Sequence, residues 1–190
     1  MSTPLWLIFL IFRSKFNLIS PYFFDLPSKP NKSQDLRIKL TEVIKLAYND
    51  RELLARLIQC EAGGEGENGM KAVASVIMNR VHASVGEYSR LGGSLRNVIF
   101  QPGQFDCATE TLNGRYNPQN IYNMNPQNEH YNIADWALAG NRLPNLGSAL
   151  WYFNPFSPTC RQNFPGQSGV FAIRIGNHCF YNPTSYYAQT

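Results

Sequence analysis

Apolar residues recur at helical spacing on both sides of a glycine-rich break at residues 63–66. Before the break, two sets indicate two helices or one bent helix: Leu40, Val43, Ile44 and Ala47, then Leu53, Leu54, Leu57 and Ile58. Asp50 stands just ahead of the second set and is the expected N-cap of its helix. After the break, a third helix is predicted over residues 67–82, with one apolar face made of Met70, Val73, Ala74, Ile77 and Val81.

The second half of the chain has weaker periodicity. Residues 84–129 are rich in Gly, Asn, Pro and Tyr, which predicts long ordered loops with little regular structure. A fourth helix is expected near residues 130–139, ending at Gly140, and the segments 149-ALWYFN-154 and 178-HCFYN-182 are typical of short aromatic strands. Because helices come first and a small sheet follows, the predicted fold is α+β, mainly helical with a small C-terminal antiparallel sheet.

Composition and charge exclude one class of partner. With 190 residues and 44% hydrophobic content, the chain is large enough for one domain with a substantial core. The formal net charge of +4 is concentrated at the start: residues 1–33 hold four cations and one acid, and the rest holds thirteen cations and twelve acids. A nearly neutral body lacks the clustered Lys and Arg that nucleic-acid binding needs, so no nucleic-acid partner is expected.

The N-terminal segment differs from the rest in composition. The apolar run 5-LWLIFLIF-12 is too short to span a bilayer, and its cations follow it, whereas a secretory signal has them ahead of the run. The stretch 26-LPSKPNKS-33 contains two prolines and is typical of a linker. We therefore expect residues 1–33 to be a non-catalytic extension and residues 34–190 to be the folded domain. Residues 5–12 are either a weak membrane-proximal anchor or part of an extension with no role in the fold.

The four cysteines are too few and too scattered to indicate a disulfide-rich scaffold. Cys60, Cys107, Cys160 and Cys179 are expected to be buried free thiols. One disulfide, for example between Cys160 and Cys179, stays open because the sequence gives no distance between their Cα atoms. No group of His, Cys or Asp residues has the spacing of a metal site, and we expect no metal and no other cofactor.

Three glutamates surround the glycine-rich break, and their surroundings predict different protonation states. Glu61 lies at the end of an apolar helix, where partial desolvation and the negative end of the helix dipole both favour its neutral form. It is therefore the candidate proton donor. Glu65 and Glu67 lie at the start of the next helix, where a carboxylate can cap free backbone amides and the dipole favours its charge. We expect these two to be capping residues.

Four segments of the chain resemble one known family. They are LARLIQCEAGGEGENGMKAVASVIMNRV (residues 54–81), 98-VIFQPGQF-105, 149-ALWYFNP-155 and 176-GNHCFYNPT-184. In this order they resemble the spore cortex-lytic enzymes of the SleB and CwlJ type, over roughly residues 45–185, with a C-terminus closer to the CwlJ branch. The resemblance implies a peptidoglycan-degrading catalytic domain with a lysozyme-like fold. The tetrad 60-CEAG-63 also resembles the catalytic-glutamate segment of resuscitation-promoting factors, which favours Glu61 over its neighbours.

The resemblance also implies a biological setting, and this chain departs from the family pattern at two points. It implies glycan strands of the spore cortex as substrate, action during germination, a place in the spore coat or a cortex-facing layer, and a coat protein as partner. Many SleB-type members have an arginine where this chain has Gly63, although CwlJ-type members also lack it. SleB-type enzymes further carry a signal peptide and a separate wall-binding domain, for which the N-terminal extension has no room.

Cleavage between N-acetylmuramic acid and N-acetylglucosamine needs an acid to protonate the bridging oxygen. A lytic transglycosylase can use one glutamate as acid and then base, whereas a hydrolase commonly adds a second carboxylate, for which Glu65, Glu67 and Asp106 are the nearest candidates. We expect the one-glutamate route, with hydrolysis as the alternative. A non-catalytic wall-binding or coat protein, and a membrane-associated wall-remodelling factor in vegetative cells, are the other interpretations.

Substrate contacts are expected from aromatic and amide side chains. Trp151, Tyr152, Phe153 and Asn154 alternate along a strand, so one pair can line a groove while the other packs inward. In 101-QPGQF-105, a Pro-Gly turn could aim the amide of Gln104 at an acetamido group.

Two further residues have candidate roles near the cleft. Arg80 either pairs with an acid near the cleft or complements the dipole of the third helix. His178 is a further substrate-binding candidate. A catalytic pair of His178 with Cys179 is disfavoured, because neighbours in a strand point to opposite faces.

Overall fold

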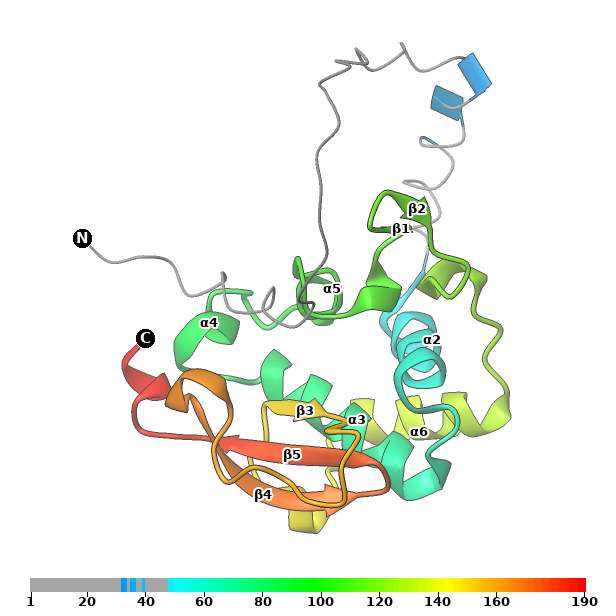
Figure 1. Cartoon of the computed structure of the whole chain (residues 1–190). Helices are drawn as coiled ribbons and strands as arrows, with labels where there is room; N and C mark the ends of the chain where they lie inside the picture. Colours follow the sequence, from blue (N-terminus) through cyan, green and yellow to red (C-terminus); the bar gives the residue numbers. More distant parts are fainter. Residues whose placement is uncertain (1–31, 34, 37–38, 40–47) are drawn as a thin grey trace, which may run out of the picture. The chain divides into compact units, whose positions relative to one another are not determined.

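The computed structural model describes residues 32–33, 35–36, 39 and 48–190, and every helix and strand labelled in Figure 1 lies after residue 48. The chain divides into two units after Lys39. In the first unit, the described residues include an exposed ion pair between Lys39 Nζ and Asp35 Oδ2 at 3.4 Å. The apolar run 5–12 and the helix predicted around residues 40–47 lie outside the described residues. None of the described helices has both the length and the apolar character needed to cross a bilayer.

The first labelled helix, α2 (Asp50–Ala62), carries Glu61 in its last turn. Its N-cap is Asn49, whose Oδ1 accepts a hydrogen bond from the Glu52 amide at 2.9 Å, so the prediction of Asp50 as the cap was wrong by one residue. Asp50 instead occupies the first turn, where a negative charge is favourable. The helix ends at the glycine pair that follows Ala62.

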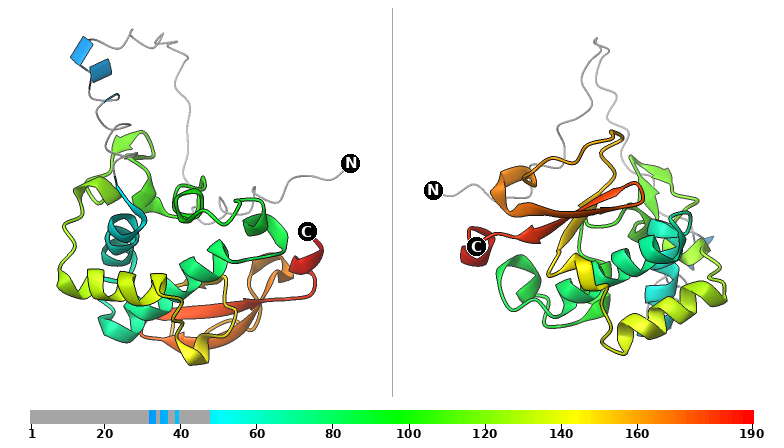
Figure 2. Two further views of the ribbon diagram at one scale, coloured as in Figure 1. Left: turned by 180° about the vertical axis from the view of Figure 1, so that it is seen from behind. Right: turned by 90° about the horizontal axis from the view of Figure 1, so that it is seen from below.

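The central helix of the fold is α3 (Gly66–Val81), close to the predicted bounds of 67–82. Its expected apolar face packs into a core shared with α2 and α6 (Asn128–Leu138). Its other side is also buried, because Ala72 and Val76 pack against Leu146, Ala149 and Phe180 of the strand region. The helix therefore lies between the other helices and the sheet, as the two views of Figure 2 show.

A three-stranded antiparallel sheet follows, with the order β3–β5–β4. Its strands are β3 (Trp151–Phe153), β4 (Gly169–Ile175) and β5 (His178–Pro183). The register pairs Tyr152 with Phe180 in the β3–β5 ladder. The sequence predicted β3 and β5 but missed β4, an edge strand whose residues are mostly partly exposed and so lack a strong apolar pattern. The small C-terminal antiparallel sheet is confirmed.

Between α3 and α6 the chain consists of short elements, as the composition of residues 84–129 predicted. They are α4 (Gly86–Ser89), α5 (Leu95–Ile99), the 3₁₀ turn η2 (Asp106–Ala108), β1 (Thr111–Leu112), β2 (Arg115–Tyr116) and the 3₁₀ turn η3 (Ile121–Asn123). A further 3₁₀ turn, η4 (Pro144–Leu146), lies between α6 and β3. Two further 3₁₀ turns, η5 (Pro165–Gln167) and η6 (Tyr187–Gln189), lie after β3. Helix α6 ends just before Gly140, whose φ of 92° is accessible mainly to glycine, in agreement with the predicted end.

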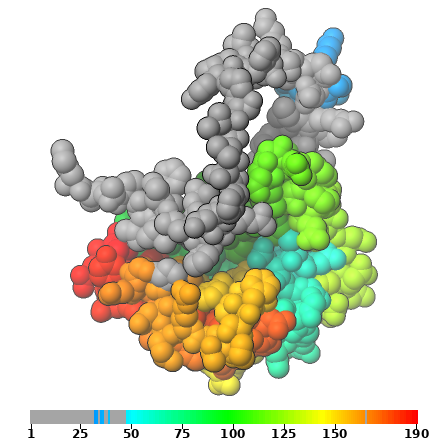
Figure 3. Space-filling view, in the orientation of Figure 1, coloured from blue at the N-terminus to red at the C-terminus, as the bar shows by residue number. Residues whose placement is uncertain are grey.

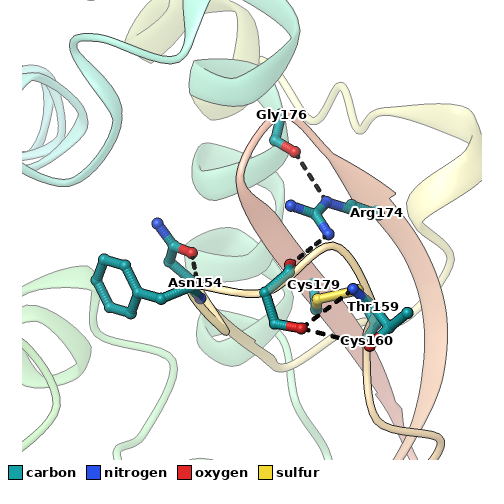
Figure 4. The surroundings of a disulfide bond; sticks show 8 residues. Asn154, Thr159, Cys160, Arg174, Gly176 and Cys179 are labelled. Carbon is teal, nitrogen blue, oxygen red and sulfur yellow. Dashed lines mark hydrogen bonds between the residues drawn. A yellow bond between two sulfur atoms is a disulfide. The ribbon is translucent and has the colours of Figure 1, made fainter.

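A disulfide joins Cys160 to Cys179, with 5.8 Å between the Cα atoms (Figure 4). The expectation of four free thiols was therefore wrong, because chain folding brings the β3–β4 loop onto β5. Arg174 holds the same loop by donating from Nη1 to the Ser157 carbonyl at 2.9 Å. Figure 3 shows this loop (gold to orange) and α2 (cyan) exposed on the same face of the molecule. Cys60 and Cys107 remain free thiols.

Candidate active site

Three elements converge on the carboxyl group of Glu61. Tyr152 of β3 donates its hydroxyl hydrogen to Glu61 Oε2 at 3.0 Å, and Cys107 of η2 donates from Sγ to Oε1 at 3.3 Å. Glu61 itself is partly buried at the end of α2, which has no basic residue in its last turn. The end of α2 thus supplies the acid, and the sheet and the loop after α5 each supply one hydrogen-bond donor to it.

The surroundings of Glu61 raise the pKa of its carboxyl group, and burial is the largest cause. The two donated hydrogen bonds and the positive charge of Arg80 act in the opposite direction, because they favour the ionised form. Asp106 adds a small increase through charge repulsion. The balance keeps a proton on Glu61 to higher pH than on an ordinary glutamate, which agrees with the protonation state that the sequence predicts.

Tyr152 can act only as a donor toward Glu61. Its own pKa is raised well above the ordinary value, first by burial and then by the nearby Glu61 charge, so its hydroxyl stays protonated. The ring lies edge-on to His178 with 5.5 Å between centroids and stacks on Phe180 at 5.7 Å. These contacts fix the direction of the hydroxyl group. The sequence predicted Tyr152 as a substrate contact, and the structure shows its hydroxyl bonded to the candidate acid.

Glu65 occupies the N-cap position of α3 but its side chain makes no capping hydrogen bond, so this expectation was wrong. The carboxylate instead accepts hydrogen bonds from the backbone amide and from Nδ2 of Asn177, both at 3.0 Å. The Asn177 amide is the largest cause of a lowered Glu65 pKa. Gly176, with φ of 55°, allows this contact because a Cβ there would lie 2.3 Å from Glu65 Oε2. Glu65 thus fastens the β4–β5 turn to the start of α3.

Glu67 lies in the first turn of α3, in the helix position that the sequence predicted. Its exposed carboxylate pairs with Lys71 Nζ at 2.5 Å, one helical turn away, and this pair lowers its pKa. Glu65 is therefore hydrogen-bonded to the neutral Asn177, and Glu67 is ion-paired with Lys71. Among the acids proposed for a second role, Asp106 is the one whose charge acts on Glu61, and it is exposed in η2.

His178 and Cys179 occupy opposite sides of β5. Burial lowers the pKa of His178, against a smaller opposing effect of the Glu65 charge, and His178 Nδ1 lies 3.9 Å from Glu65 Oε1. Cys179 is bonded to Cys160. The structure therefore excludes a Cys179–His178 catalytic pair, as strand geometry predicted, and places the imidazole ring beside Tyr152.

Arg80 is buried, with 4% of its surface exposed. Its Nε donates to the Leu150 carbonyl at 2.7 Å, and its guanidinium group lies over the rings of Tyr88 and Phe105, 4.9 and 5.3 Å from their centroids. Within the described part of the chain it forms no ion pair, so pairing with a cleft acid is not observed. Its influence on Glu61 is that of a buried charge at longer range.

The remaining substrate-binding candidates fall into two groups. Trp151 is only 7% exposed and packs edge-on against Tyr187 at 4.8 Å, so it belongs to the core and leaves little surface for a sugar. Gln104 and Asn154 are partly exposed, but their carbonyl oxygens are engaged. Gln104 Oε1 accepts from the Tyr88 hydroxyl at 3.0 Å, and Asn154 Oδ1 accepts from the Phe156 amide at 2.8 Å (Figure 4).

Sequence reasoning missed Cys107 as a neighbour of the acid. The sulfur atoms of Cys60 and Cys107 and a carboxylate oxygen of Glu61 lie within 4.8 Å of one another. This is the one group of the described residues compact enough to hold a metal ion, and the sequence could not show it because 46 positions separate Glu61 from Cys107. The available signal was the position of each cysteine in or near a segment that carries the resemblance, because Cys60 is the first residue of 60-CEAG-63 and Cys107 lies two positions after 101-QPGQF-105.

Residues 64–181 match the family model described as Cell Wall Hydrolase. The chain belongs to this family. The matched residues begin just after Glu61.

Two curated relatives represent the two branches. Cell wall hydrolase CwlJ of Bacillus subtilis is 30% identical over 143 residues, which cover 75% of this chain and 92% of CwlJ. The spore cortex-lytic enzyme of Bacillus subtilis is 33% identical over 133 residues, which cover 70% of this chain and 37% of that protein. The resemblance to the SleB and CwlJ family, closer to CwlJ, is confirmed.

Solved structures share the fold. The catalytic domain of the germination-specific lytic transglycosylase SleB from Bacillus anthracis is 27% identical, with a TM-score of 0.51, and the match covers 72% of this chain and 98% of that domain. The catalytic domain of SleB from Bacillus cereus is 28% identical, with a TM-score of 0.52, and the match covers 70% of this chain and 89% of that domain. These neighbours confirm the α+β, lysozyme-like fold.

Proposed function

We propose that this protein cleaves the glycan strands of peptidoglycan, with Glu61 as the catalytic acid. The observation that carries the proposal is one partly buried carboxyl group with a raised pKa, held by donors from Tyr152 and Cys107. The names of the relatives, a cell wall hydrolase and a spore cortex-lytic enzyme, support the substrate class. The bond cleaved joins N-acetylmuramic acid to N-acetylglucosamine.

The proposed reaction is that of a lytic transglycosylase. Glu61 gives its proton to the bridging oxygen as the bond to C1 of the muramic acid breaks and positive charge builds on that ring. The resulting Glu61 carboxylate then takes the proton of the C6 hydroxyl, whose oxygen bonds to C1 and closes a 1,6-anhydro ring. The proton balance is complete, because Glu61 ends the cycle protonated and the leaving sugar keeps the first proton.

The engagement of the other glutamates supports the one-glutamate route. Glu65 is held by Asn177 and Glu67 by Lys71, so neither is free to activate water at the bond that Glu61 protonates. The alternative is hydrolysis, for which Asp106 is the favoured second carboxylate because its charge already acts on Glu61. Substrate would be positioned by the partly exposed Gln104, Asn154, Tyr152 and His178.

We place this activity in spore germination, on the spore cortex, with the protein in the spore coat or a cortex-facing layer. The support is the naming of its relatives as spore cortex-lytic and germination-specific enzymes. Residues 34–190 would be the catalytic domain and residues 1–33 a non-catalytic extension. Membrane contact through residues 5–12 and binding to a coat protein are further proposals. A non-catalytic wall-binding role is the competing function.

The test is mass spectrometry of the muropeptides that the full-length protein releases from purified spore peptidoglycan. We expect fragments ending in 1,6-anhydromuramic acid from the wild type and from Glu67→Gln, an exposed-carboxylate control, and none from Glu61→Gln. Reducing-end muramic acid would favour hydrolysis. No release by a wild type with native circular dichroism would favour the wall-binding role.

A further inference from the structure

Two free thiols flank the candidate acid. Cys60 precedes Glu61 in the last turn of α2, and Cys107 reaches it from η2, so that both sulfur atoms and a Glu61 oxygen lie within 4.8 Å of one another. The other two cysteines of the chain, Cys160 and Cys179, are already joined in a disulfide. Disulfides form and persist in oxidising compartments, so a chain that holds one disulfide exposes its remaining thiol pair to the same conditions.

The two thiols differ in accessibility. Cys60 is partly exposed and donates to the Gln119 carbonyl at 3.4 Å. Cys107 is 3% exposed and donates to Glu61 Oε1 at 3.3 Å. An oxidant from solvent therefore reaches Cys60 first, while Cys107 is placed to attack second. The pKa of Cys107 is raised, with its contact to Cys60 as the largest cause and burial next, so Cys107 stays protonated before the second step.

We propose that Cys60 and Cys107 form a redox modification site that reacts with small-molecule disulfides and closes to a second disulfide beside Glu61. This bond would tie the end of α2 to the loop that carries Gln104. It would also replace the Cys107 S–H group, which is one of the two donors to Glu61, with a sulfur that has no hydrogen to donate.

The chemistry balances with a disulfide such as oxidised glutathione as the oxidant. The Cys60 thiolate attacks one sulfur of the oxidant, and a mixed disulfide forms while one glutathione thiolate leaves. Cys107 then attacks the Cys60 sulfur, and its proton passes to the second glutathione thiolate as that thiolate leaves. The protein loses two hydrogens and two electrons, and the oxidant becomes two thiols.

The chemical test uses the full-length protein, oxidised glutathione and alkylation of free thiols, read by mass spectrometry. We expect two alkylated cysteines before treatment and none after it. Trypsin should then release the peptide 57–71, which holds Cys60, bonded to the peptide 97–115, which holds Cys107. Cys60→Ala should keep one alkylated thiol, at Cys107, under the same treatment.

Three results would overturn this chemical proposal. The first is two thiols that persist after treatment, and the second is a glutathione adduct on Cys60 that never resolves. The third is a wild type that keeps both thiols and co-purifies with a stoichiometric metal ion, where the Cys60→Ala variant has no such ion. That result would make the group a metal site. None of these readouts depends on glycan cleavage, so they stay separate from any failure of the proposed function.

A second readout rests on the proposed function and follows activity against pH. The groups that act on the Glu61 proton are Arg80 of α3, Tyr152 of β3, and Asp106 and Cys107 of η2, while Cys60 lies near it on the same helix without a contribution of its own. Loss of the Cys107 donor should move the alkaline limit of activity upward by roughly 0.5–1 pH unit, the equivalent of one hydrogen bond. Oxidised wild type and Cys107→Ala should show this shift. Cys60→Ala, which keeps the Cys107 donor, should not shift with or without oxidant, and a shift there would overturn the assignment.

Discussion

Tyr152 donates a hydrogen bond to Glu61 at 3.0 Å although 91 positions separate the two residues. One lies at the end of α2 and the other on β3, so the acid acquires its environment only when the helical region and the sheet assemble around α3. The tyrosine therefore links the folding of the domain to the protonation state of the candidate acid.

Replacement of Tyr152 by Phe should lower the cleavage rate while the fold is preserved. The variant removes a donor that favours the ionised form of Glu61, so the Glu61 pKa should rise further and the alkaline limit of activity should move to higher pH. The lost positioning of the carboxyl should cost roughly 1 kcal/mol of barrier, or a factor of about 5–10 in rate. Muropeptide release measured across a pH series separates the two effects.

Tyr181→Phe is the matched control for this variant. Tyr181 lies on the adjacent strand β5 and is fully buried, and within the described part of the chain its hydroxyl makes no hydrogen bond to Glu61. Its loss should leave both rate and pH profile unchanged. An equal loss of activity in the two variants would mean that Tyr152 acts through packing and not through its bond to Glu61.

Glu61→Gln should stabilise the folded protein at neutral pH while it abolishes cleavage. The folded-state pKa of Glu61 is raised, so the folded chain binds more protons than the unfolded chain between the two pKa values, and its stability falls as pH rises through that interval. A neutral glutamine avoids this loss. We expect a gain of about 1 kcal/mol, a few degrees in melting temperature for a domain of this size.

Thermal unfolding at several pH values measures this effect. The difference between wild type and Glu61→Gln should be largest at neutral pH and should vanish below the pKa of an unfolded glutamate. A glutamine variant that is less stable at neutral pH would show that the ionised carboxylate is favoured in the folded state, contrary to the proposed role as acid.

The sequence placed Glu61 correctly at the end of a helix because the relevant information is local. An apolar helix, a carboxyl in its last turn and a pair of glycines are adjacent in the chain, and periodicity alone places them. The same reasoning found α3 and the end of α6. Periodicity predicted only one buried face of α3. The other face carries small residues such as Ala72, which are buried by partners from a distant part of the chain, the strand region.

Contacts between residues far apart in the sequence could not be predicted, because periodicity carries only local information. The bonds from Cys107 to Glu61, from Asn177 to Glu65 and between Cys160 and Cys179 each depend on how loops fold over the helices. Capping was a sound expectation for Glu65 from its position. Its carboxylate instead accepts two hydrogen bonds from the β4–β5 turn and none from the free amides of α3. Edge strand β4 lacked a pattern strong enough to be found.

Glu65→Gln should destabilise the domain at neutral pH by about 1 kcal/mol, because a charged acceptor of two hydrogen bonds becomes a neutral one. The folded-state pKa of Glu65 is lowered, so its contribution is present above the pKa of an unfolded glutamate and is lost as pH falls through the folded value. The gap between wild type and variant should therefore close under acidic conditions. Glu67→Gln, which removes an exposed ion pair, should change stability far less. Equal losses in both variants would contradict a special role for the Asn177 contact.

Removal of the Cys160–Cys179 disulfide should cost more than any of these changes. The bond closes a loop with a sequence separation of 19, for which loop entropy alone gives about 3 kcal/mol. The double variant Cys160→Ala, Cys179→Ala should therefore melt many degrees lower, and cleavage should weaken because β5 carries His178 beside Tyr152. Denaturant unfolding of this variant and of reduced wild type should give the same midpoint, since both lack the same bond. A variant as stable as the oxidised wild type would mean that the β3–β4 loop is held in place by its other contacts, such as that of Arg174 with Ser157.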